Sequence, residues 1–405
     1  IGYDPQTAGG LFTFGGTGAL LYGVKIGLEK ACPHTGKSGV QRRAIIICSQ
    51  AAHYACTTVA NWLGIGEDNV LRIPTSADSD ICIDAYEQCL RDALAAGTPV
   101  AAIVATMGTT DAFGIDDLES MVAIRDRLAR EFNLETPPHI HADSVIGWAW
   151  SVFNDYDWEE NPLEFRYRTV RSLAGAVDRL RHLHQADSLG VDYHKTGFAP
   201  YISSAFLIRD AGQLQHIARD QETMPYLFQA GMYHPGKFTL ETSRSGGGPM
   251  AALANMLLLG KDGFRALLGH LVTMAETLRE HLGGHVSTTV FNKNNYGPVT
   301  LFRVYPDGVN TFNVPRREAS DPDYRDRLLM HNHYNRRIYD LLHEDALKGE
   351  GVVISMTDCY RRTDYGEPIS ALKSYIMSPF AEEKYVDAVL ESIWKARRQI
   401  AAEKE

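Results

Sequence analysis

The sequence contains few cysteines and no pairing pattern among them. Six cysteines are spread over 405 residues, and no two of them form a CxxC pair. Several lie in apolar runs, where a reduced thiol packs as a small hydrophobic side chain. This distribution disfavours a disulfide scaffold, and we expect a protein of the reducing cytoplasm.

Long hydrophobic runs and an excess of basic residues are absent too. No apolar stretch approaches the roughly 18 residues that a membrane-spanning helix needs, and no signal peptide is visible. The chain begins at Ile1 in what reads as a continuing sequence, so we expect an N-terminal segment before it. The formal net charge of −10 disfavours nucleic acid or an anionic membrane as the main partner, because both require a basic surface. These absences favour chemistry on a small molecule.

Short β-branched runs alternate with amphipathic stretches along the first half of the chain. Apolar residues near a 3.6-residue period predict helices over 18–31 and 116–132. The strand candidates are residues 44–48, 70–73, 100–106, 139–143, 187–191 and 204–208. This alternation predicts an α/β domain with a largely parallel sheet. The close succession of the last two candidates predicts one antiparallel strand.

The pattern changes near residue 283. Residues 249–283 predict a long helix with a break at Gly260 or Gly263. The elements expected after it are strands at 288–292, 299–305 and 351–356 and helices at 322–346 and 381–402. We therefore expect a large domain over 1–283 and a small α+β domain over 284–405.

A glycine-rich segment, TFGGTGALLYG, occupies residues 13–23. A strand-like entry followed by glycines and a helix exposes backbone N–H groups at a helix N-terminus, which can bind an anion. The same pattern also fits an ordinary turn in which Thr17 caps the helix. Both interpretations remain open on this segment alone.

A second candidate is the strand that ends in HIHAD. A period of two places His139, His141 and Asp143 on one face, with Asp143 at the carboxyl end, where open α/β sheets bind their ligands. One interpretation is a structural strand end with satisfied polar groups. Another is a metal site, which lacks a nearby fourth ligand. The third is a buried carboxylate that faces a ligand cation.

Two further residues follow strand candidates. His53 is either a structural histidine or a ring that covers a ligand, and Lys195 is either a solvated turn residue or an enclosed amine that forms a Schiff base. Together, the segments offer a helix N-terminus for a phosphate, an aspartate for a pyridinium nitrogen, a ring to stack and a lysine for an aldehyde. Pyridoxal 5′-phosphate (PLP) requires all four.

Six ordered segments resemble the group II PLP-dependent amino acid decarboxylases, which include aromatic amino acid, tyrosine, glutamate and aspartate decarboxylases. The segments are GLFTFGGTGALLYG (10–23), SQAAHYA (49–55), ATMGTTDAFGIDD (105–117), HIHADSVIG (139–147), ADSLGVDYHK (186–195) and TLETSRSG (239–246). The resemblance implies an α/β fold of type I, similar to aspartate aminotransferase. In that fold a large domain with a mostly parallel seven-stranded sheet is joined to a smaller α+β C-terminal domain. It also implies a homodimer with active sites at the interface.

The resemblance assigns a role to each matching residue. Lys195 would form the internal aldimine, Asp143 would pair with the pyridine nitrogen, and His53 would stack on the ring. Arg244 matches an arginine that supports the site. The remaining cofactor contacts fall on Gly16, Thr17, Gly18, Thr106, Ser188, Asp192 and His194. No metal is expected.

The implied activity is decarboxylation of an L-amino acid to CO₂ and a primary amine, through an aldimine and a quinonoid. The family's proton donor is a tyrosine on a loop before the arginine segment, for which Tyr233 is the first candidate and Tyr226 the second. Either tyrosine is equally compatible with an ordinary surface aromatic. An aromatic substrate is favoured over an acidic one by Trp148, Trp150, Phe153 and Tyr156.

The sequence departs from the family at two places that concern the substrate pocket. Ser144–Val145 stands where the family commonly has two alanines after the aspartate, and Thr196–Gly197 replaces a bulky residue after the lysine. Alternative activities on the same fold are a carbon–carbon lyase and an aldehyde-forming decarboxylase–oxidase. A non-catalytic homologue and a metal hydrolase that uses the HxHxD motif are alternatives from other classes.

Overall fold

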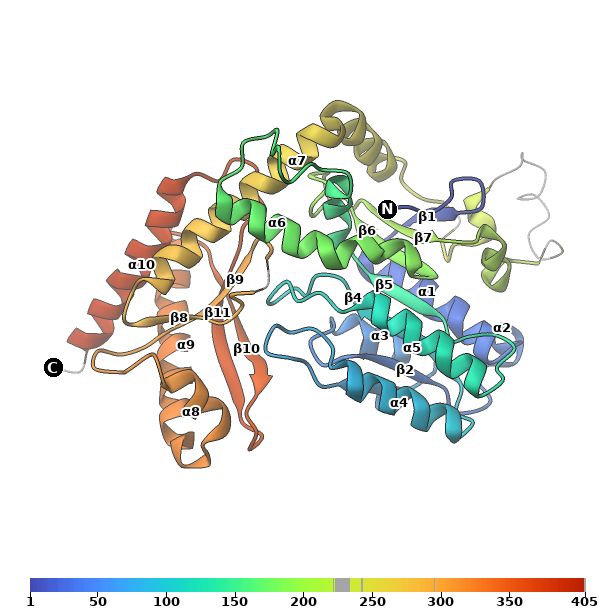
Figure 1. Cartoon of the computed structure of the whole chain (residues 1–405), viewed down its shortest axis with the longest axis horizontal. Helices are drawn as coiled ribbons and strands as arrows, with labels where there is room; N and C mark the ends of the chain where they lie inside the picture. The colour runs from blue at the N-terminus through green and yellow to red at the C-terminus, as the bar shows by residue number, and fades with distance from the viewer. Residues whose placement is uncertain (221, 223–233, 242, 295, 404–405) are drawn as a thin grey trace. The chain divides into compact units, whose positions relative to one another are not determined.

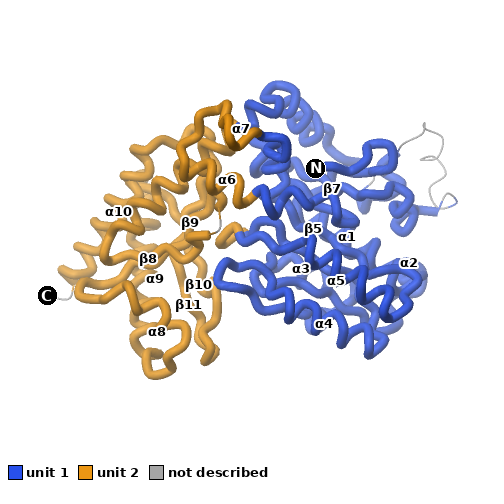
Figure 2. Tube along the Cα trace, in the orientation of Figure 1, with its two compact units in different colours: residues 1–109, 114–156, 177–265 blue, residues 110–113, 157–176, 266–405 orange. Residues whose placement is uncertain are grey.

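The structure is a computed structural model that describes residues 1–220, 222, 234–241, 243–294 and 296–403. The chain folds into two compact units (Figure 2). Unit 1 comprises residues 1–109, 114–156 and 177–265, and unit 2 comprises 110–113, 157–176 and 266–405. Helices α6 (Tyr167–Leu180) and α7 (Gly247–Gly283) contribute to both units, so the contacts do not divide at residue 283.

Unit 1 is built on a seven-stranded sheet in the order β1-β7-β6-β5-β4-β2-β3 (Figure 1). The strands are β1 (Gly9–Thr13), β2 (Ile45–Ser49), β3 (Val70–Ile73), β4 (Val100–Thr106), β5 (Ile140–Asp143), β6 (Ser188–Asp192) and β7 (Ser204–Ile208). Strands β6, β5, β4, β2 and β3 are mutually parallel, and β7 pairs antiparallel with both β6 and β1. The mostly parallel seven-stranded sheet and the antiparallel strand are confirmed. Each of the six strand candidates for this sheet agrees with the structure within one residue. Of the later candidates, the one over 351–356 is wrong in its bounds, because that strand spans Ser355–Arg362.

Helix α1 (Gly16–Ala31) packs against one face of this sheet through glycines. A Cβ atom at Gly23 would lie 2.3 Å from His141 Nδ1, and one at Gly27 would lie 2.0 Å from the carbonyl oxygen of Ala101. Only glycine allows so close an approach of the helix to the strands. Val104 packs in one core cluster with side chains of α1. The side chains at alternate positions from Val104 on β4 therefore lie on the face of the sheet that α1 covers.

The other helices of unit 1 complete its layers. They are α2 (Thr35–Ser38), α3 (Ala55–Trp62), α4 (Ile83–Ala95) and α5 (Leu118–Glu131). Helices α4 and α5 lie side by side (Figure 1), and Tyr86 donates a hydrogen bond to the carbonyl of Met121 between them at 3.1 Å. Asp117 caps α5 by accepting from the backbone N–H of Ser120 at 3.2 Å. The helices predicted over 18–31 and 116–132 are confirmed.

Unit 2 contains a four-stranded antiparallel sheet in the order β10-β11-β9-β8. Its elements are β8 (Thr288–Val290), β9 (Val299–Val304), β10 (Ser355–Arg362), β11 (Pro368–Tyr375), α8 (Val314–Ser320), α9 (Arg325–Leu347) and α10 (Glu383–Ala402). The long helix α7 breaks at Gly260, whose φ of 56° and ψ of −169° are not helical. Strand β11 is an element that the sequence reading missed.

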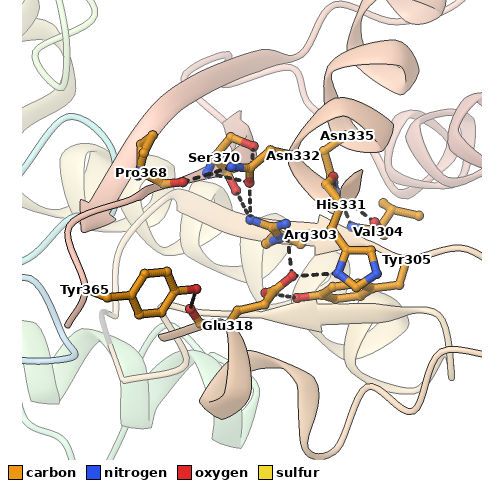
Figure 3. Close-up of polar contacts among 10 residues, drawn as sticks. All are labelled: Arg303, Val304, Tyr305, Glu318, His331, Asn332, Asn335, Tyr365, Pro368 and Ser370. Carbon is orange, nitrogen blue, oxygen red and sulfur yellow. Dashed lines mark hydrogen bonds and ion pairs between the residues drawn. The ribbon is translucent and has the colours of Figure 1, made fainter. Parts of the chain in front are cut away.

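A polar network lies in the core of unit 2 (Figure 3). Glu318 accepts hydrogen bonds from Tyr305 at 2.9 Å and His331 at 2.7 Å, and it forms an ion pair with Arg303 at 3.2 Å. All four side chains are buried. Buried charges need such partners, since water cannot solvate them there.

The expectations about cysteines and about membrane-spanning helices can be compared with the described residues. The six cysteines are free thiols there. No helix within the described ranges is long and apolar enough to cross a membrane.

Candidate active site

Three adjacent strands of unit 1 each carry a polar side chain at the carboxyl edge of the sheet. Thr106 of β4 is paired in register with Asp143 of β5, and Asp192 ends β6. Each of the three lies two positions after a residue on the face that α1 covers, namely Val104, His141 and Gly190. Residues two apart in a strand share a face, so Thr106, Asp143 and Asp192 lie on that face as well. The carboxyl edge of parallel strands is where open α/β sheets bind ligands.

Helix α1 begins directly beside these side chains. A Cβ atom at Gly16 would lie 2.8 Å from Val145 Cγ1 and 3.2 Å from Asp192 Oδ2, so glycine is required there. The first helical hydrogen bonds are donated by Gly18 and Ala19 to the carbonyl of Gly15, which leaves the preceding amides available. No side chain caps the helix, and Thr17 is exposed. The helix N-terminus can therefore accept an anion.

Lys195 lies in the turn after β6 and is held by a buried carboxylate. Its Nζ is 3.0 Å from Asp192 Oδ2, and 24% of the lysine side chain is exposed. Ser204 donates to Asp192 Oδ1 at 2.6 Å, so both carboxylate oxygens are engaged. His194 Nε2 is 3.5 Å from Asp192 Oδ2, and burial lowers the pKa of His194. Lys195 is thus an enclosed amine and not a solvated turn residue.

Asp143 is a second carboxylate near this lysine. Burial raises the pKa of Asp143 to about 6, while the charge of Lys195 lowers it and that of Asp192 raises it. Two carboxylates and one ammonium leave an excess of negative charge at the sheet edge. A cation beside Asp143 would relieve it.

Thr106 and Asp116 form the third part of the sheet edge. The Oγ1 atom of Thr106 is buried and has no hydrogen-bond partner among the described residues. Asp116 accepts from the backbone N–H groups of Thr106 and Ile81, both at 2.7 Å. Burial raises the pKa of Asp116 to about 7, although these two hydrogen bonds lower it. Asp116 fixes the strand end, and the threonine hydroxyl is left for another partner.

His53 lies between β2 and α3, at the same edge of the sheet. Its Nδ1 accepts from the backbone N–H of Ala55 at 3.1 Å, and its ring lies 4.0 Å from that of Tyr54. The pKa of Cys56 in α3 is raised by its hydrogen bond with Cys48, by burial and by the charge of Asp143. His53 and Asp143 thus both lie at the carboxyl edge of the sheet, after β2 and at the end of β5.

Arg244 reaches the site through β1. It donates a hydrogen bond to the backbone carbonyl of Phe12, two residues before the loop that enters α1. A cavity of about 580 Å³ lies here, with Phe12, Phe14, Ile202 and Arg244 in its wall. Arg244 thus supports the loop and also borders a cavity next to it.

Ser188 does not lie with the other predicted residues. It begins β6, at the amino edge of the sheet, and its Oγ is 2.8 Å from His139 Nε2 and 2.9 Å from His141 Nδ1. Strand β6 runs from Ser188 to Asp192, which separates the two ends by roughly 13 Å. Within the described ranges, no group of three or more metal-binding side chains could hold a metal ion. The two histidines are polar residues of the strand with a serine partner.

Aromatic residues that the sequence reading assigned to the substrate lie in the core. Trp150 and Phe153 are fully buried, and Tyr156 is almost so. Trp148 donates from Nε1 to the carbonyl of Asp192 at 3.2 Å and packs edge-on against Tyr193 at 4.8 Å. The hint of an aromatic substrate from these residues is not supported, because they hold the backbone behind Asp192.

Some supporting residues were not found from the sequence, and others cannot be placed. Ser204 and Tyr193 contact the site only because β7 folds back on β6 and Tyr193 stacks on Phe12 at 5.7 Å. No local sequence signal marks either contact. Tyr233 and Tyr226 lie outside the described residues.

Comparisons with known proteins find similarity to amino acid decarboxylases. No family model matches the chain. An L-tyrosine decarboxylase of Enterococcus faecium is 25% identical over 360 residues, which are 84% of this chain and 56% of the relative. An L-2,4-diaminobutyrate decarboxylase of Acinetobacter baumannii is 24% identical over 325 residues, 76% of this chain and 58% of the relative. The chain is thus similar in sequence to amino acid decarboxylases, at 24–25% identity to these two.

The fold of these decarboxylases is shared. The crystal structure of Oryza sativa TDC with PLP and tryptamine superposes with a TM-score of 0.74 at 16% identity, covering 97% of this chain and 71% of that chain. The fold of type I expected from the resemblance is confirmed. The chain spans a little over half the length of the curated relatives just described.

Both departures from the group II pattern have a structural counterpart. Val145 packs against the start of α1, and Ser144 donates to the carbonyl of Gly190 at 2.8 Å. Thr196 donates to the carbonyl of Ile146 at 2.8 Å, which ties the lysine turn to the end of β5. A Cβ atom at Gly197 would lie 2.6 Å from the carbonyl of Tyr193, so the turn requires glycine. The residues at both departures therefore contact the backbone that holds the lysine turn.

Proposed function

We propose that this protein is a PLP-dependent L-amino acid decarboxylase, which releases CO₂ and a primary amine. The observation that carries the proposal is the grouping of Lys195, Asp192 and Asp143 at the carboxyl edge of the sheet, beside the start of α1. The similarity to tyrosine and diaminobutyrate decarboxylases supports the same reaction.

The residues of the site fit the cofactor in several respects. The amides before Gly18, which donate no helical hydrogen bond, suit a phosphate. The raised pKa of Asp143 reflects burial without a sufficient counter-charge, which a protonated ring nitrogen would provide. The unpaired Oγ1 of Thr106 is available to the polar edge of the ring. When bound, PLP supplies an aldehyde carbon that condenses with amines and a pyridinium ring that accepts an electron pair.

The chain's own groups would hold that chemistry in place. Asp192 Oδ2 holds Lys195 Nζ at 3.0 Å. Asp143 would keep a proton on the ring nitrogen, because a carboxylate in low-dielectric surroundings strongly favours a neighbouring cation. His53 would cover one face of the ring. Gly16 and Thr17 bind the phosphate through their backbone amides, with Gly18 leaving the turn room to approach.

The proton that replaces CO₂ at the α-carbon is assigned to a tyrosine. Tyr233 is the first candidate and Tyr226 the second, because both lie on the segment before Arg244, where the family carries its donor. Replacement of the donor by phenylalanine should permit at most one rapid CO₂ per site and then slow the steady release of CO₂ and amine together, because the α-carbon lacks its proton. A Tyr233→Phe variant with an unchanged steady rate of amine release moves the role to Tyr226.

An aromatic L-amino acid is the substrate that we infer. The cavity of about 580 Å³ beside the α1 loop has Phe12, Phe14 and Ile202 in its wall, and Phe14 is 42% exposed. These three side chains favour a ring, and Glu241 and Arg244 also line the wall. The relative named for tyrosine agrees with this inference. Glu241 would suit the second amine of diaminobutyrate, so the product analysis below compares both substrates.

We further infer a homodimer. The first half of α7 exposes Met250 at 64%, Leu257 at 77% and Leu258 at 83%. Adjacent large apolar side chains on one helix are typical of a covered surface. Light scattering should give twice the mass of the chain, and a Leu257→Lys/Leu258→Lys variant should give the mass of one chain.

Absorbance and product analysis test the proposed reaction. Protein saturated with PLP should show a band near the visible edge and release CO₂ and amine from tyrosine or tryptophan in preference to aspartate or diaminobutyrate. Lys195→Ala should lose the band and the activity, whereas the matched variant Lys261→Ala, an exposed lysine paired with Asp155, should keep both. Aldehyde with ammonia, or a cleaved carbon–carbon bond, would replace the decarboxylase by one of its alternatives. A colourless protein after addition of PLP would overturn the proposal.

A further inference from the structure

A groove lies at the edge of the unit 1 sheet opposite Lys195. Helix α1 ends there, and β4, β5 and β6 begin there, since all three run parallel. Three cavities of about 280, 760 and 610 Å³ adjoin one another at this edge, and Lys30 is in the wall of each. We call them together the Lys30 groove.

Lys30 is half-buried and unpaired. Among the described residues, none places a carboxylate oxygen within 4.0 Å of its Nζ, and none forms a hydrogen bond with it. Burial lowers the pKa of Lys30, Asp187 and Asp210 act to raise it, and Arg125 and Arg209 act to lower it. A half-buried ammonium without a partner is uncommon, because the charge loses solvation and gains nothing in return.

Asp187, one of the two acids whose charge acts on Lys30, already forms ion pairs with two arginines. Asp187 Oδ2 is 2.8 Å from Arg125 Nη1, and Asp187 Oδ1 is 2.7 Å from Arg209 Nη2. Asp210 accepts from the backbone N–H of Gly212 at 2.8 Å. These acids fix the walls of the groove. Arg42 and Lys37 also line it, but Lys30 is the half-buried cation there that has no carboxylate partner among the described residues.

His139 supplies a second, independent observation. Its ring is 1% exposed and forms part of the wall of two of the three cavities, the ones of about 280 and 760 Å³. Nε2 is 2.8 Å from Ser188 Oγ, but Nδ1 is buried without a hydrogen-bond partner within the described ranges. Burial lowers the pKa of His139 to about 4, so the ring is neutral near pH 7. A buried, unpaired ring nitrogen at a cavity wall points to a missing partner.

The hydrogen bonds of Ser188 can select the tautomer of His139. The hydroxyl has one proton and two imidazole neighbours, His139 Nε2 and His141 Nδ1, at 2.8 and 2.9 Å. If Ser188 donates to His139 Nε2 and accepts from His141 Nδ1–H, then His139 carries its proton on Nδ1. In that state His139 Nδ1 carries a proton that has no acceptor among the described residues.

We propose that Lys30 and His139 form a binding site for a small oxyanion, a carboxylate or phosphate group, distinct from the site at Lys195. Lys30 supplies the charge, and His139 Nδ1–H supplies a neutral hydrogen bond of fixed direction. Charge-assisted hydrogen bonds of this kind are the stronger ones in proteins. The site stands on the opposite edge of the sheet and does not depend on the proposed decarboxylase reaction.

A nitrogen NMR titration tests the site directly. The protein is labelled with ¹⁵N-histidine and saturated with PLP, so that the phosphate position at α1 is filled, and it is titrated in parallel with inorganic phosphate and with acetate. The His139 signals are assigned from their loss in His139→Gln. We expect a saturable shift of the His139 Nδ1 signal in at least one arm, because its N–H gains an acceptor, and the arm that saturates identifies the oxyanion.

Two charge-matched variants decide the role of Lys30. Lys30→Met should weaken the saturable binding about tenfold or more, whereas Lys261→Met, which removes the same charge elsewhere, should leave it within about twofold. Absence of a saturable His139 shift in both arms would overturn the proposal. Equal binding by the wild-type protein and Lys30→Met would overturn it as well.

Discussion

The two units each contain a cluster of one carboxylate, one cation and one histidine, with opposite properties. In unit 2, Glu318, Arg303 and His331 are all buried, and both carboxylate oxygens have partners (Figure 3). In unit 1, Asp192 is likewise buried and doubly bonded, but Lys195 is 24% exposed. A cation that is held but still accessible can react, whereas one that is sealed in the core can only stabilise.

The two clusters also differ in the polar groups that lack a hydrogen-bond or ion-pair partner. The unit 1 cluster adds a second carboxylate, Asp143, and an unpaired hydroxyl on Thr106. In unit 2, Arg303 Nε also lacks a hydrogen-bond partner among the described residues, but the charge of Arg303 is matched by Glu318. A buried carboxylate without a matching cation, such as Asp143, marks a place where stability has been given up for binding.

The largest effect should follow from breaking the unit 2 cluster. Glu318→Ala leaves Arg303 as an uncompensated buried charge, and we expect unfolding to become easier by about 3–5 kcal/mol. Glu318→Gln retains the acceptor oxygen and should cost less. Urea denaturation measures the change, with Glu382→Ala, an exposed partner of Lys384, as the control without effect. A Glu318→Ala variant as stable as the control would show that the cluster is not structural.

The opposite sign is expected at Asp143. Its pKa in the folded protein, about 6, lies above the unfolded value, so ionisation favours the unfolded chain. Asp143→Asn should therefore stabilise the cofactor-free protein at pH 8 by about 1–3 kcal/mol. The gain should shrink below pH 6 and vanish near pH 4, where both states bind the proton.

Urea denaturation of cofactor-free protein across this pH range measures the gain. Asp262→Asn, an exposed aspartate paired with Arg265, is the matched control. Destabilisation by Asp143→Asn at pH 8 would mean that this carboxylate is part of the structural frame. Asp143 would then stabilise the folded protein, as Glu318 does.

The smallest effect is expected at Gly16, on binding and not on folding. A methyl group there meets Val145 Cγ1 at 2.8 Å and narrows the phosphate position. Gly16→Ala should weaken PLP binding about tenfold, or roughly 1.4 kcal/mol, and the double variant Gly16→Ala/Val145→Ala should recover most of it. Gly283→Ala, where a Cβ atom meets nothing within 4 Å, is the control. Unchanged affinity in Gly16→Ala would remove the start of α1 from the cofactor site.

Sequence reasoning succeeded where the signal is local. The runs of β2 and β4 and the glycines before α1 are short-range patterns. The short segments HIHAD and DSLGV likewise placed Asp143 at the end of β5 and Lys195 just after β6. Strand β11, PISALKSY, has a mixed pattern of burial that no simple alternation predicts.

Contacts between distant residues were beyond that reasoning. Ser188 and Asp192 occupy one strand, and only its direction in the sheet decides which of them reaches the site. Ser204 meets Asp192 because β7 turns back on β6. The burial of Trp150 and Phe153 depends on what packs around them, so their composition alone suggested a substrate role that the core explains.

The central claim is that Lys195 carries PLP. Protein saturated with PLP is reduced with borohydride, digested and mapped by mass spectrometry. Our account predicts one phosphopyridoxyl group per chain, attached to Lys195, and none in Lys195→Ala. A label on another lysine, or no stable label at all, would contradict it.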